Sequence, residues 1–264
     1  MIVYRESTAL VTGASKGLGE AFADALAARG MNLVLVARSV DALQALARRL
    51  ATNYGVSCIP LNADLADPGS VNRIGEQLKL EEIQIDLLIN NAGLGLTGDF
   101  LSHDIRKEQA AIQVNVQSLV ALTHLFGCDM AIRGKGGIIN VASNSAFQPL
   151  PHMATYAAAK AFVLHFSEAL QHELKAKGVR VMAACPGPTA TSFFDGTSTA
   201  LSEKDFDSSE AVVRNILKAF DQGKAVSYPG RMSVRAAILA PRLLPRDLIT
   251  RLAATATKKM GLHT

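Results

Sequence analysis

The stretch ALVTGASKGLG, Ala9 to Gly19, joins a short apolar run to a glycine-rich turn and the start of an amphipathic segment. The apolar run is typical of a buried strand, and the segment that begins at Gly19 has the periodicity of a helix. Glycines at positions 13, 17 and 19 permit a tight turn and let backbone N–H groups approach a phosphate at the helix N-terminus. The turn therefore predicts a pyrophosphate-binding loop between the first strand and the first helix.

The spacing of these glycines indicates which class of phosphate-binding loop the turn belongs to. Their order is G-x-x-x-G-x-G, which differs from the commoner G-x-G-x-x-G fingerprint. The stretch lacks the Gly-Lys-Ser/Thr ending of a nucleoside-triphosphate loop, which argues against phosphoryl transfer. An ordinary strand–helix turn is the alternative, and the position between a buried strand and a helix favours the phosphate-binding role.

Short apolar runs alternate with longer amphipathic segments along most of the chain. The predicted strands are 9–12, 33–36, 56–61, 85–89, 138–141 and 179–183, and 225–228 could add a late edge strand. The predicted helices include 19–29, 40–50, 104–125 and 155–177. Strands that are apolar on both faces and alternate with helices indicate right-handed βαβ units. We therefore predict an α/β fold: a Rossmann-type, doubly wound parallel sheet in a three-layer α/β/α domain over residues 1–264.

The composition of the chain limits the classes of protein to which it can belong. The 264 residues are 49% hydrophobic and 19% charged, which is typical of a globular chain with a large core. The net charge is +4, Trp is absent and no basic run is interleaved with aromatics, so no nucleic-acid partner is expected. The three cysteines are far apart and show no zinc spacing, which predicts no metal site and a reduced, cytoplasmic setting. Neither a signal peptide nor an apolar run of roughly 18 residues is expected.

The end of the second predicted strand bears on the choice of cofactor. A site for NAD carries a carboxylate there to accept hydrogen bonds from the adenosine ribose. In this chain Ala37 stands at that place and Arg38 follows, and Lys16 lies inside the glycine turn. A guanidinium suits a 2′-phosphate. We therefore expect NADP as cofactor, with NADPH preferred over NADH. The alternative is that both cations are solvated surface residues.

Several motifs follow the glycine turn in a fixed order. They are NADL (Asn62–Leu65), NNAG (Asn90–Gly93), VNVQS (Val114–Ser118), INVASNSA (Ile139–Ala146), YAAAK (Tyr156–Lys160) and PGPTAT (Pro186–Thr191). Tyr156 lies thirteen positions after Ser143, and Lys160 lies four positions after Tyr156. Over about residues 7–195 the chain resembles the short-chain dehydrogenase/reductase family.

The resemblance implies a catalytic set of Asn115, Ser143, Tyr156 and Lys160. Tyr156 is then the general acid/base, and Lys160 tunes it and holds the nicotinamide ribose. Asn115 supports a proton relay through a water, and Ser143 positions the carbonyl. The residues expected to bind the cofactor are Gly13, Ser15, Lys16, Gly17, Leu18, Gly19, Arg38, Asp64, Leu65, Asn91, Ala92, Gly93, Tyr156, Lys160, Pro186, Gly187, Thr189 and Thr191.

Elementary chemistry explains why a tyrosine would stand one helical turn before a lysine. Reduction of a carbonyl requires a hydride on carbon and a proton on oxygen, but a solvated phenol has a pKa near 10. Residues i and i+4 share a helix face, so Lys160 can lie beside Tyr156 and lower the pKa of the phenol. A serine at the carboxyl end of a strand, such as Ser143, can steady the carbonyl oxygen as negative charge develops.

The sequence after the catalytic motifs is less informative. We expect a substrate loop and an edge strand over 189–235, in which Phe193 and Phe194 form part of a lid, with His152 and Met153 also lining a substrate pocket. The apolar and basic tail, 236–264, is interrupted by prolines and too broken to span a bilayer. It could pack on the sheet, seal a dimer or make peripheral contact with an anionic membrane. The family resemblance implies a homodimer or homotetramer.

These observations predict an NADP-dependent oxidoreductase that reduces a carbonyl to an alcohol, or catalyses the reverse. An apolar ketone, acyl thioester or steroid-like alcohol is the expected kind of substrate. A 3-oxoacyl-thioester reductase of fatty-acid type would use the same four residues. A non-catalytic NADP-sensing protein on the same fold is a third alternative, and the intact catalytic set argues against it.

Overall fold

The computed structural model describes residues 3–191, 200, 203–231, 238, 241 and 243–263. Within this part of the chain, a seven-stranded parallel sheet has the order β3-β2-β1-β4-β5-β6-β7. The strands are β1 (Thr8–Thr12), β2 (Asn32–Ala37), β3 (Cys58–Asn62), β4 (Leu87–Asn90), β5 (Gly136–Val141), β6 (Val179–Ala184) and β7 (Val226–Ser227). The strand order reverses between β1 and β4, as in the predicted doubly wound fold, which is thereby confirmed.

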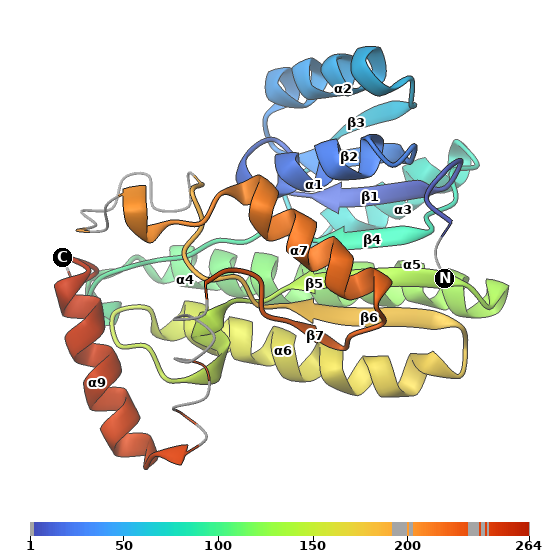
Figure 1. The fold of residues 1–264 in the computed structure, drawn as a ribbon. Helices are drawn as coiled ribbons and strands as arrows, with labels where there is room; N and C mark the ends of the chain where they lie inside the picture. Colours follow the sequence, from blue (N-terminus) through green and yellow to red (C-terminus); the bar gives the residue numbers. More distant parts are fainter. Residues whose placement is uncertain are drawn as a thin grey trace.

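Both faces of the sheet are covered by helices (Figure 1). The helices are α1 (Gly17–Ala27), α2 (Val40–Tyr54), α3 (Ser70–Leu80), α4 (Ile105–Ile112), α5 (Leu119–Arg133), α6 (Ala154–Lys175), α7 (Ser209–Asp221) and α9 (Arg246–Lys259). Alternate residues of β1 enter different cores: Val11 packs among residues of α1, α2 and α7, and Leu10 among residues of α3 and α5. All of β1 after Thr8 is buried, which explains why its sequence is apolar throughout rather than alternating.

The predicted strands agree with the structure to within two residues at most ends, and the late edge strand is confirmed as β7. The predicted helix over 104–125 is wrong in detail. The structure has α4, then a π-helical segment η2 (Gln113–Ser118), then α5, which runs on to Arg133. Helices α3 and α7 were not among the predicted segments. Each nevertheless buries one apolar stripe, which is the pattern of an amphipathic helix.

The continuous helical run Ile105–Arg133 is long and apolar enough to cross a membrane by length and composition alone. Half of its most apolar window is buried within the fold. Its apolar residues include Leu122, Phe126 and Met130, which pack in the core beneath the sheet. Its composition therefore has an explanation in the packing of a core helix.

The tail ends in α9, which stands apart from the other helices at one end of the sheet (Figure 1). Its buried residues, Ile249, Ala253 and Thr257, are four apart and form one face. Beside this face, Leu248 and Leu252 are 43% and 53% accessible. Ala253 and Thr257 of this inward face line the cavity of the candidate site.

Candidate functional site

A cavity of about 800 Å³ lies beyond the carboxyl ends of the strands. The residues that follow β1, β2, β3, β4, β5 and β6 all contribute to its wall. It brings together the predicted site residues, which lie far apart in the sequence. The exceptions are Gly19 and Asn115, which do not line it. The cavity is thus located where open α/β sheets bind ligands.

The glycine turn forms one end of this cavity. Gly13 and Gly17 have φ values of +64° and +60°, a backbone region that favours glycine. A Cβ on Gly17 would lie 2.9 Å from Cγ2 of Thr191, and one on Gly19 would lie 2.0 Å from the carbonyl oxygen of Gly13. Gly19 therefore closes the turn by allowing close packing and does not face the cavity.

The start of α1 suits a phosphate. Its N-cap residue is Lys16, whose side chain makes no capping hydrogen bond, and Lys16, Gly17 and Leu18 line the cavity. The N–H groups of an uncapped helix N-terminus carry partial positive charge and can bind an anion. The turn residues and the helix start therefore fit the pyrophosphate of a dinucleotide.

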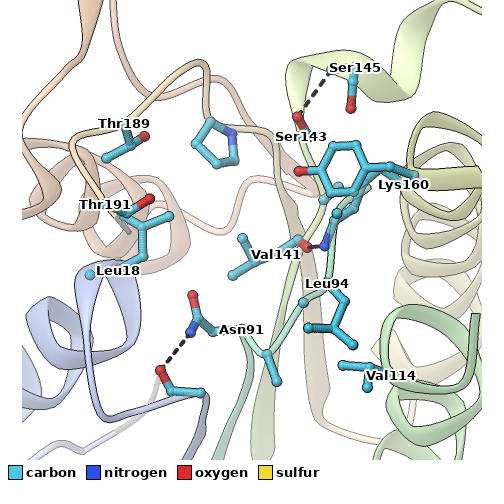
Figure 2. A pocket seen from close by; sticks show the side chains of 18 of the residues that line it. Leu18, Asn91, Leu94, Val114, Val141, Ser143, Ser145, Lys160, Thr189 and Thr191 are labelled. Carbon is cyan, nitrogen blue, oxygen red and sulfur yellow. Dashed lines mark hydrogen bonds between the residues drawn. The ribbon is translucent and has the colours of Figure 1, made fainter. Parts of the chain in front are cut away.

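The glycine turn is tied to the NNAG segment through Thr12. The buried Thr12 Oγ1 accepts hydrogen bonds from the backbone N–H groups of Asn91 and Ala92, each at 3.0 Å. In return, Asn91 Nδ2 donates to the backbone oxygens of Thr12 at 2.9 Å and of Gly13 at 3.3 Å. Asn91 points toward the turn in Figure 2. These bonds fix the relative position of two walls of the cavity.

Ser143 and Tyr156 meet at the opposite end of the cavity. Ser143 follows β5, is 8% exposed, and its Oγ accepts a hydrogen bond of 3.2 Å from the backbone N–H of Ser145. Burial raises the pKa of Tyr156 to about 12, and a side-chain hydrogen bond with Ser143 opposes this rise. The expectation that the pKa of this phenol is lowered is therefore wrong for the protein alone, because burial outweighs the neighbouring groups.

Lys160 lies on the next turn of α6 and is 4% exposed. Its Nζ donates a hydrogen bond of 2.9 Å to the backbone oxygen of Val141 and lies 5.7 Å from the ring centroid of Tyr156 (Figure 2). Burial lowers the pKa of the Lys160 amine to about 8. The two groups share one side of α6 as predicted, and both line the cavity.

Asn115 lies behind the cavity, in the π-helical segment η2. Its Nδ2 donates to the backbone oxygens of Leu94 at 2.6 Å and Ala111 at 2.9 Å. Its buried Oδ1 has no hydrogen-bond partner among the described residues. A Cβ added to Gly93 would lie 3.0 Å from this Oδ1 and 3.4 Å from Nζ of Lys160, so the two polar atoms approach the same backbone position. Such π segments occur often at functional sites.

The two predicted cations lie at the rim of the cavity. Lys16 and Arg38 are exposed and line it, and neither takes part in an ion pair within the described part of the chain. Asp64 also lines the cavity, and its Oδ1 accepts a hydrogen bond of 3.0 Å from the N–H of Ala66. Arg38 is therefore free to bind an anionic group of a dinucleotide.

The sequence did not reveal every residue of the cavity wall. Ala253, Ala256 and Thr257 of α9 line it, followed by Met260 and Leu262. In the sequence, only the helical spacing of small side chains in the tail could have indicated that these residues line a cavity. Ser145 and Gln148 also line the cavity, and each has a buried oxygen without a partner in the described structure.

The expectations for the substrate pocket are met in part. Met153 lines the cavity, as expected, but His152 does not; it lines a smaller neighbouring cavity. Phe193 and Phe194, the expected lid residues, lie outside the described residues.

Known proteins resemble this chain in sequence. A family model described as short chain dehydrogenase matches residues 7–201. The 17-beta-hydroxysteroid dehydrogenase type 3 of Homo sapiens is 36% identical over 202 residues, which are 75% of this chain and 64% of that protein. The very-long-chain 3-oxoacyl-CoA reductase of Rattus norvegicus is 33% identical over 222 residues, 80% of this chain and 67% of that protein. The human inactive hydroxysteroid dehydrogenase-like protein 1 is 34% identical over 187 residues, 70% of this chain and 56% of that protein.

Solved structures share the fold. The short-chain dehydrogenase from Sphingobium yanoikuyae in complex with NADPH has a TM-score of 0.81 and 34% identity, and the match covers 89% of this chain and 93% of that one. The matched region spans between 56% and 64% of the length of three hydroxysteroid dehydrogenase relatives. Similarity thus extends over the sheet and the site, and a third or more of each of those relatives lies outside the match.

Proposed function

Since the chain belongs to the short-chain dehydrogenase/reductase family, we propose that it is an NADPH-dependent reductase that converts bulky, apolar ketones to alcohols. Members of this family are NAD(P)-dependent oxidoreductases that act on CH–OH groups. The observation that carries the proposal is the hydrogen-bonded pair of Ser143 and Tyr156, with the buried Lys160 beside it, at the edge of a cavity of about 800 Å³.

The residues of the cavity fit a dinucleotide at the end opposite Tyr156. The glycine turn and the start of α1 would hold its pyrophosphate, and Asp64 and Leu65 would lie at its adenine. Arg38 and Lys16 would hold a 2′-phosphate, which favours NADPH over NADH. NADPH supplies a hydride to the carbonyl carbon when it is bound.

Side chains of this protein supply the proton that the carbonyl oxygen receives. Because burial keeps the pKa of Tyr156 high, its hydroxyl is protonated at neutral pH and can donate to the carbonyl oxygen. Ser143 Oγ lies beside this hydroxyl and stabilises negative charge on the same oxygen. Lys160 and Asn115 approach each other at Gly93, where a proton could be passed back to Tyr156.

The shape of the substrate end supports a bulky apolar substrate. Met153, Leu150 and Leu262 line it, and α9 presents the small residues Ala253 and Ala256 to it. Apolar surface with a few convergent polar groups is typical of sites for small organic ligands. The unpartnered oxygens of Ser145 and Gln148 provide such polar groups.

A 3-oxoacyl-thioester reductase is the second candidate, because one relative is named a very-long-chain 3-oxoacyl-CoA reductase. It would use the same catalytic residues, so only the substrate separates the two. If the protein reduces bulky ketones faster than 3-oxoacyl thioesters, the first proposal is supported. If it reduces the thioesters faster, the second is supported.

The test is oxidation of NADPH at 340 nm with a panel of ketones and 3-oxoacyl thioesters. Replacing Tyr156 by Phe removes the proton donor and should lower kcat by about 10²-fold or more, with little change in NADPH binding. Tyr54→Phe, on the exposed side of α2, is the matched control. Binding of NADPH without turnover of any substrate would instead indicate a non-catalytic protein, as the name of one relative suggests for that relative.

A further inference from the structure

A second cavity, of about 220 Å³, borders the first. The two share one lining residue, Met153. Its wall comes from the loop that follows β4, from His103 and Glu108 near the start of α4, and from the first residues of α6. Apart from His152 and Met153, which were expected to line a substrate pocket, none of the predicted site residues lines this cavity.

Glu108 is the unusual group in its wall. It is 5% exposed, and its Oε1 lies 2.6 Å from Nδ1 of His103. His103 Nε2 lies 3.0 Å from the backbone oxygen of Thr97, which can only accept, so Nε2 carries a proton. The hydrogen bond to Glu108 raises the pKa of His103, and each ring nitrogen of His103 lies within hydrogen-bond distance of an oxygen, an arrangement that favours the protonated imidazole.

The second oxygen of Glu108, Oε2, is buried and has no hydrogen-bond partner in the described part of the chain. Buried polar atoms are almost always paired, and a carboxylate oxygen accepts more than one hydrogen bond. Asp99 also lines the cavity, so a second carboxylate favours a donor there. No group of three or more metal-ligating side chains exists among the described residues. The surroundings of Oε2 therefore suit an organic hydrogen-bond donor.

The backbone fixes this cavity relative to Tyr156. His152 has a φ of +64°, which is uncommon for a residue other than glycine. Its carbonyl accepts a hydrogen bond of 3.0 Å from the N–H of Gly98, which joins the two walls. Met153 follows directly and lies one helical turn before Tyr156. Methionine is flexible, so its side chain can move to join the two cavities.

We propose that this cavity is a donor subsite, formed around Glu108, His103, Asp99 and Met153, that binds a hydroxyl or ammonium group carried by the substrate away from its carbonyl. The inference rests on the proposed function, since it assigns the reduced ketone a second, polar group. The carbonyl lies at Ser143 and Tyr156, the carbon chain passes Met153, and the donor binds Oε2 of Glu108.

The first experiment uses the unmodified protein. Its kcat/KM is measured with NADPH for a series of 2-alkanones of increasing length and for their ω-hydroxy and ω-amino counterparts. If the subsite binds a donor, then at one chain length the kcat/KM of the ω-hydroxy or ω-amino ketone should exceed that of the unsubstituted 2-alkanone by about tenfold. The hydroxy and amino arms show which donor is preferred. No preference at any length overturns the subsite but leaves the proposed function standing, whereas no reduction of any ketone overturns both.

The second experiment removes the charge of Glu108. Glu108→Gln should lower the ratio of kcat/KM for the preferred donor-bearing ketone over the plain ketone to about 1, mainly through KM. Glu173→Gln, an exposed substitution on α6, is the control and should keep the ratio. A Glu108→Gln variant that is folded by circular dichroism and keeps the ratio contradicts the proposal.

Discussion

At the scale of single residues, burial decides the chemistry of the site. Tyr156 and Lys160 were expected to act as an acidic phenol beside an ammonium, but both charged forms are disfavoured in the interior of the protein. The pKa of the phenol is raised and that of the amine is lowered. This arrangement suits proton donation to a carbonyl, and it makes Lys160 a residue that reduces stability.

Replacing Lys160 by Met should stabilise the fold at neutral pH and abolish activity. The unfolded chain binds the lysine proton below pH 10.5, whereas the folded protein binds it only below about 8. Above pH 10.5 the amine is neutral in both states, so it does not lower the free energy of unfolding. As the pH falls from 10.5 to 8, the unfolded chain takes up a proton that the folded protein does not. The free energy of unfolding is therefore lowered by about 3 kcal/mol at pH 7. The lost hydrogen bond to Val141 offsets about 1 kcal/mol of the gain.

Urea unfolding at pH 7 and at pH 10 measures this effect. The variant should be more stable than the wild type at pH 7 by about 2 kcal/mol, and the difference should shrink at pH 10. Lys175→Met, on the exposed side of the same helix, controls for the loss of a lysine. A variant that is equally destabilised at both values of pH would contradict the account of Lys160.

Arg38 tests the expected choice of cofactor. Replacing it by Ala removes a charge-assisted bond to a 2′-phosphate and should lower the ratio of kcat/KM for NADPH over NADH by about tenfold or more. Arg48→Ala, an exposed residue of α2 outside the cavity, should leave the ratio unchanged. If the wild type already uses NADH as well as NADPH, the expected preference is refuted.

At the scale of elements, the parallel strands and most helices could be predicted, because their residues carry a local signal. A strand buried on both faces is apolar throughout, and a glycine turn marks the junction of β1 and α1. Residues such as Arg38, Asn91 and Ser143 could be placed because each follows a strand at the same edge of the sheet. Asn115, Tyr156 and Lys160 lie on helical segments, and the family resemblance assigned their roles. The fold and the candidate site were thus predictable as far as local patterns determine them.

Other features depend on contacts that no local pattern reveals. The π-helical winding at Asn115 cannot be distinguished from an α-helix by the spacing of apolar residues. A buried chain of side-chain hydrogen bonds runs from Asn90 through Asn140 to Ser167 and joins β4, β5 and α6, and its members lie 50 and 27 positions apart. The cavity-lining role of α9 depends on how the tail returns to the site. Three-dimensional packing decides each of these features.

The wall formed by α9 should determine the size of accepted substrates. Ala256 lines the cavity yet is exposed at its rim, so a larger side chain there narrows the opening without disturbing the core. Ala256→Phe should lower kcat/KM for bulky ketones by about tenfold and affect small ketones much less. Thr255→Phe, exposed and outside the cavity, is the matched control. Equal losses for both substrate sizes would argue against α9 as a selective wall.

At the scale of the whole molecule, exposed apolar side chains gather on helices of one face of the sheet. Leu125 and Ile132 on α5 are 38% and 86% exposed, and Phe162 on α6 is 40% exposed. The ring of Phe162 stacks on Phe166 at 5.5 Å, which leaves one broad aromatic surface. We propose that copies of the chain meet at this face; the expected homo-oligomer stays a prediction.

A charge on this face should change the oligomeric state. Phe162→Asp should shift the mass measured by light scattering after size-exclusion chromatography toward that of one chain, because an unpaired carboxylate opposes burial. Val40→Asp, on α2 at the other face of the sheet and 47% exposed, should leave the mass as in the wild type. An unaltered mass for Phe162→Asp, or a wild type that is monomeric, would exclude this face as the interface.

The π winding at Gln113–Ser118 has a consequence for how this helix tolerates insertions and deletions. A π turn holds one residue more than a regular turn does, so it takes up an extra residue without rotating α4 relative to α5. Deleting one residue there would let the run rewind as a regular α-helix, and Glu108 and Ala111 would keep the direction they face now. Deleting one residue within α5 would instead rotate everything on its N-terminal side by about 100° about the axis. The fold should therefore tolerate a one-residue deletion at Gln113–Ser118 better than the same deletion in α5.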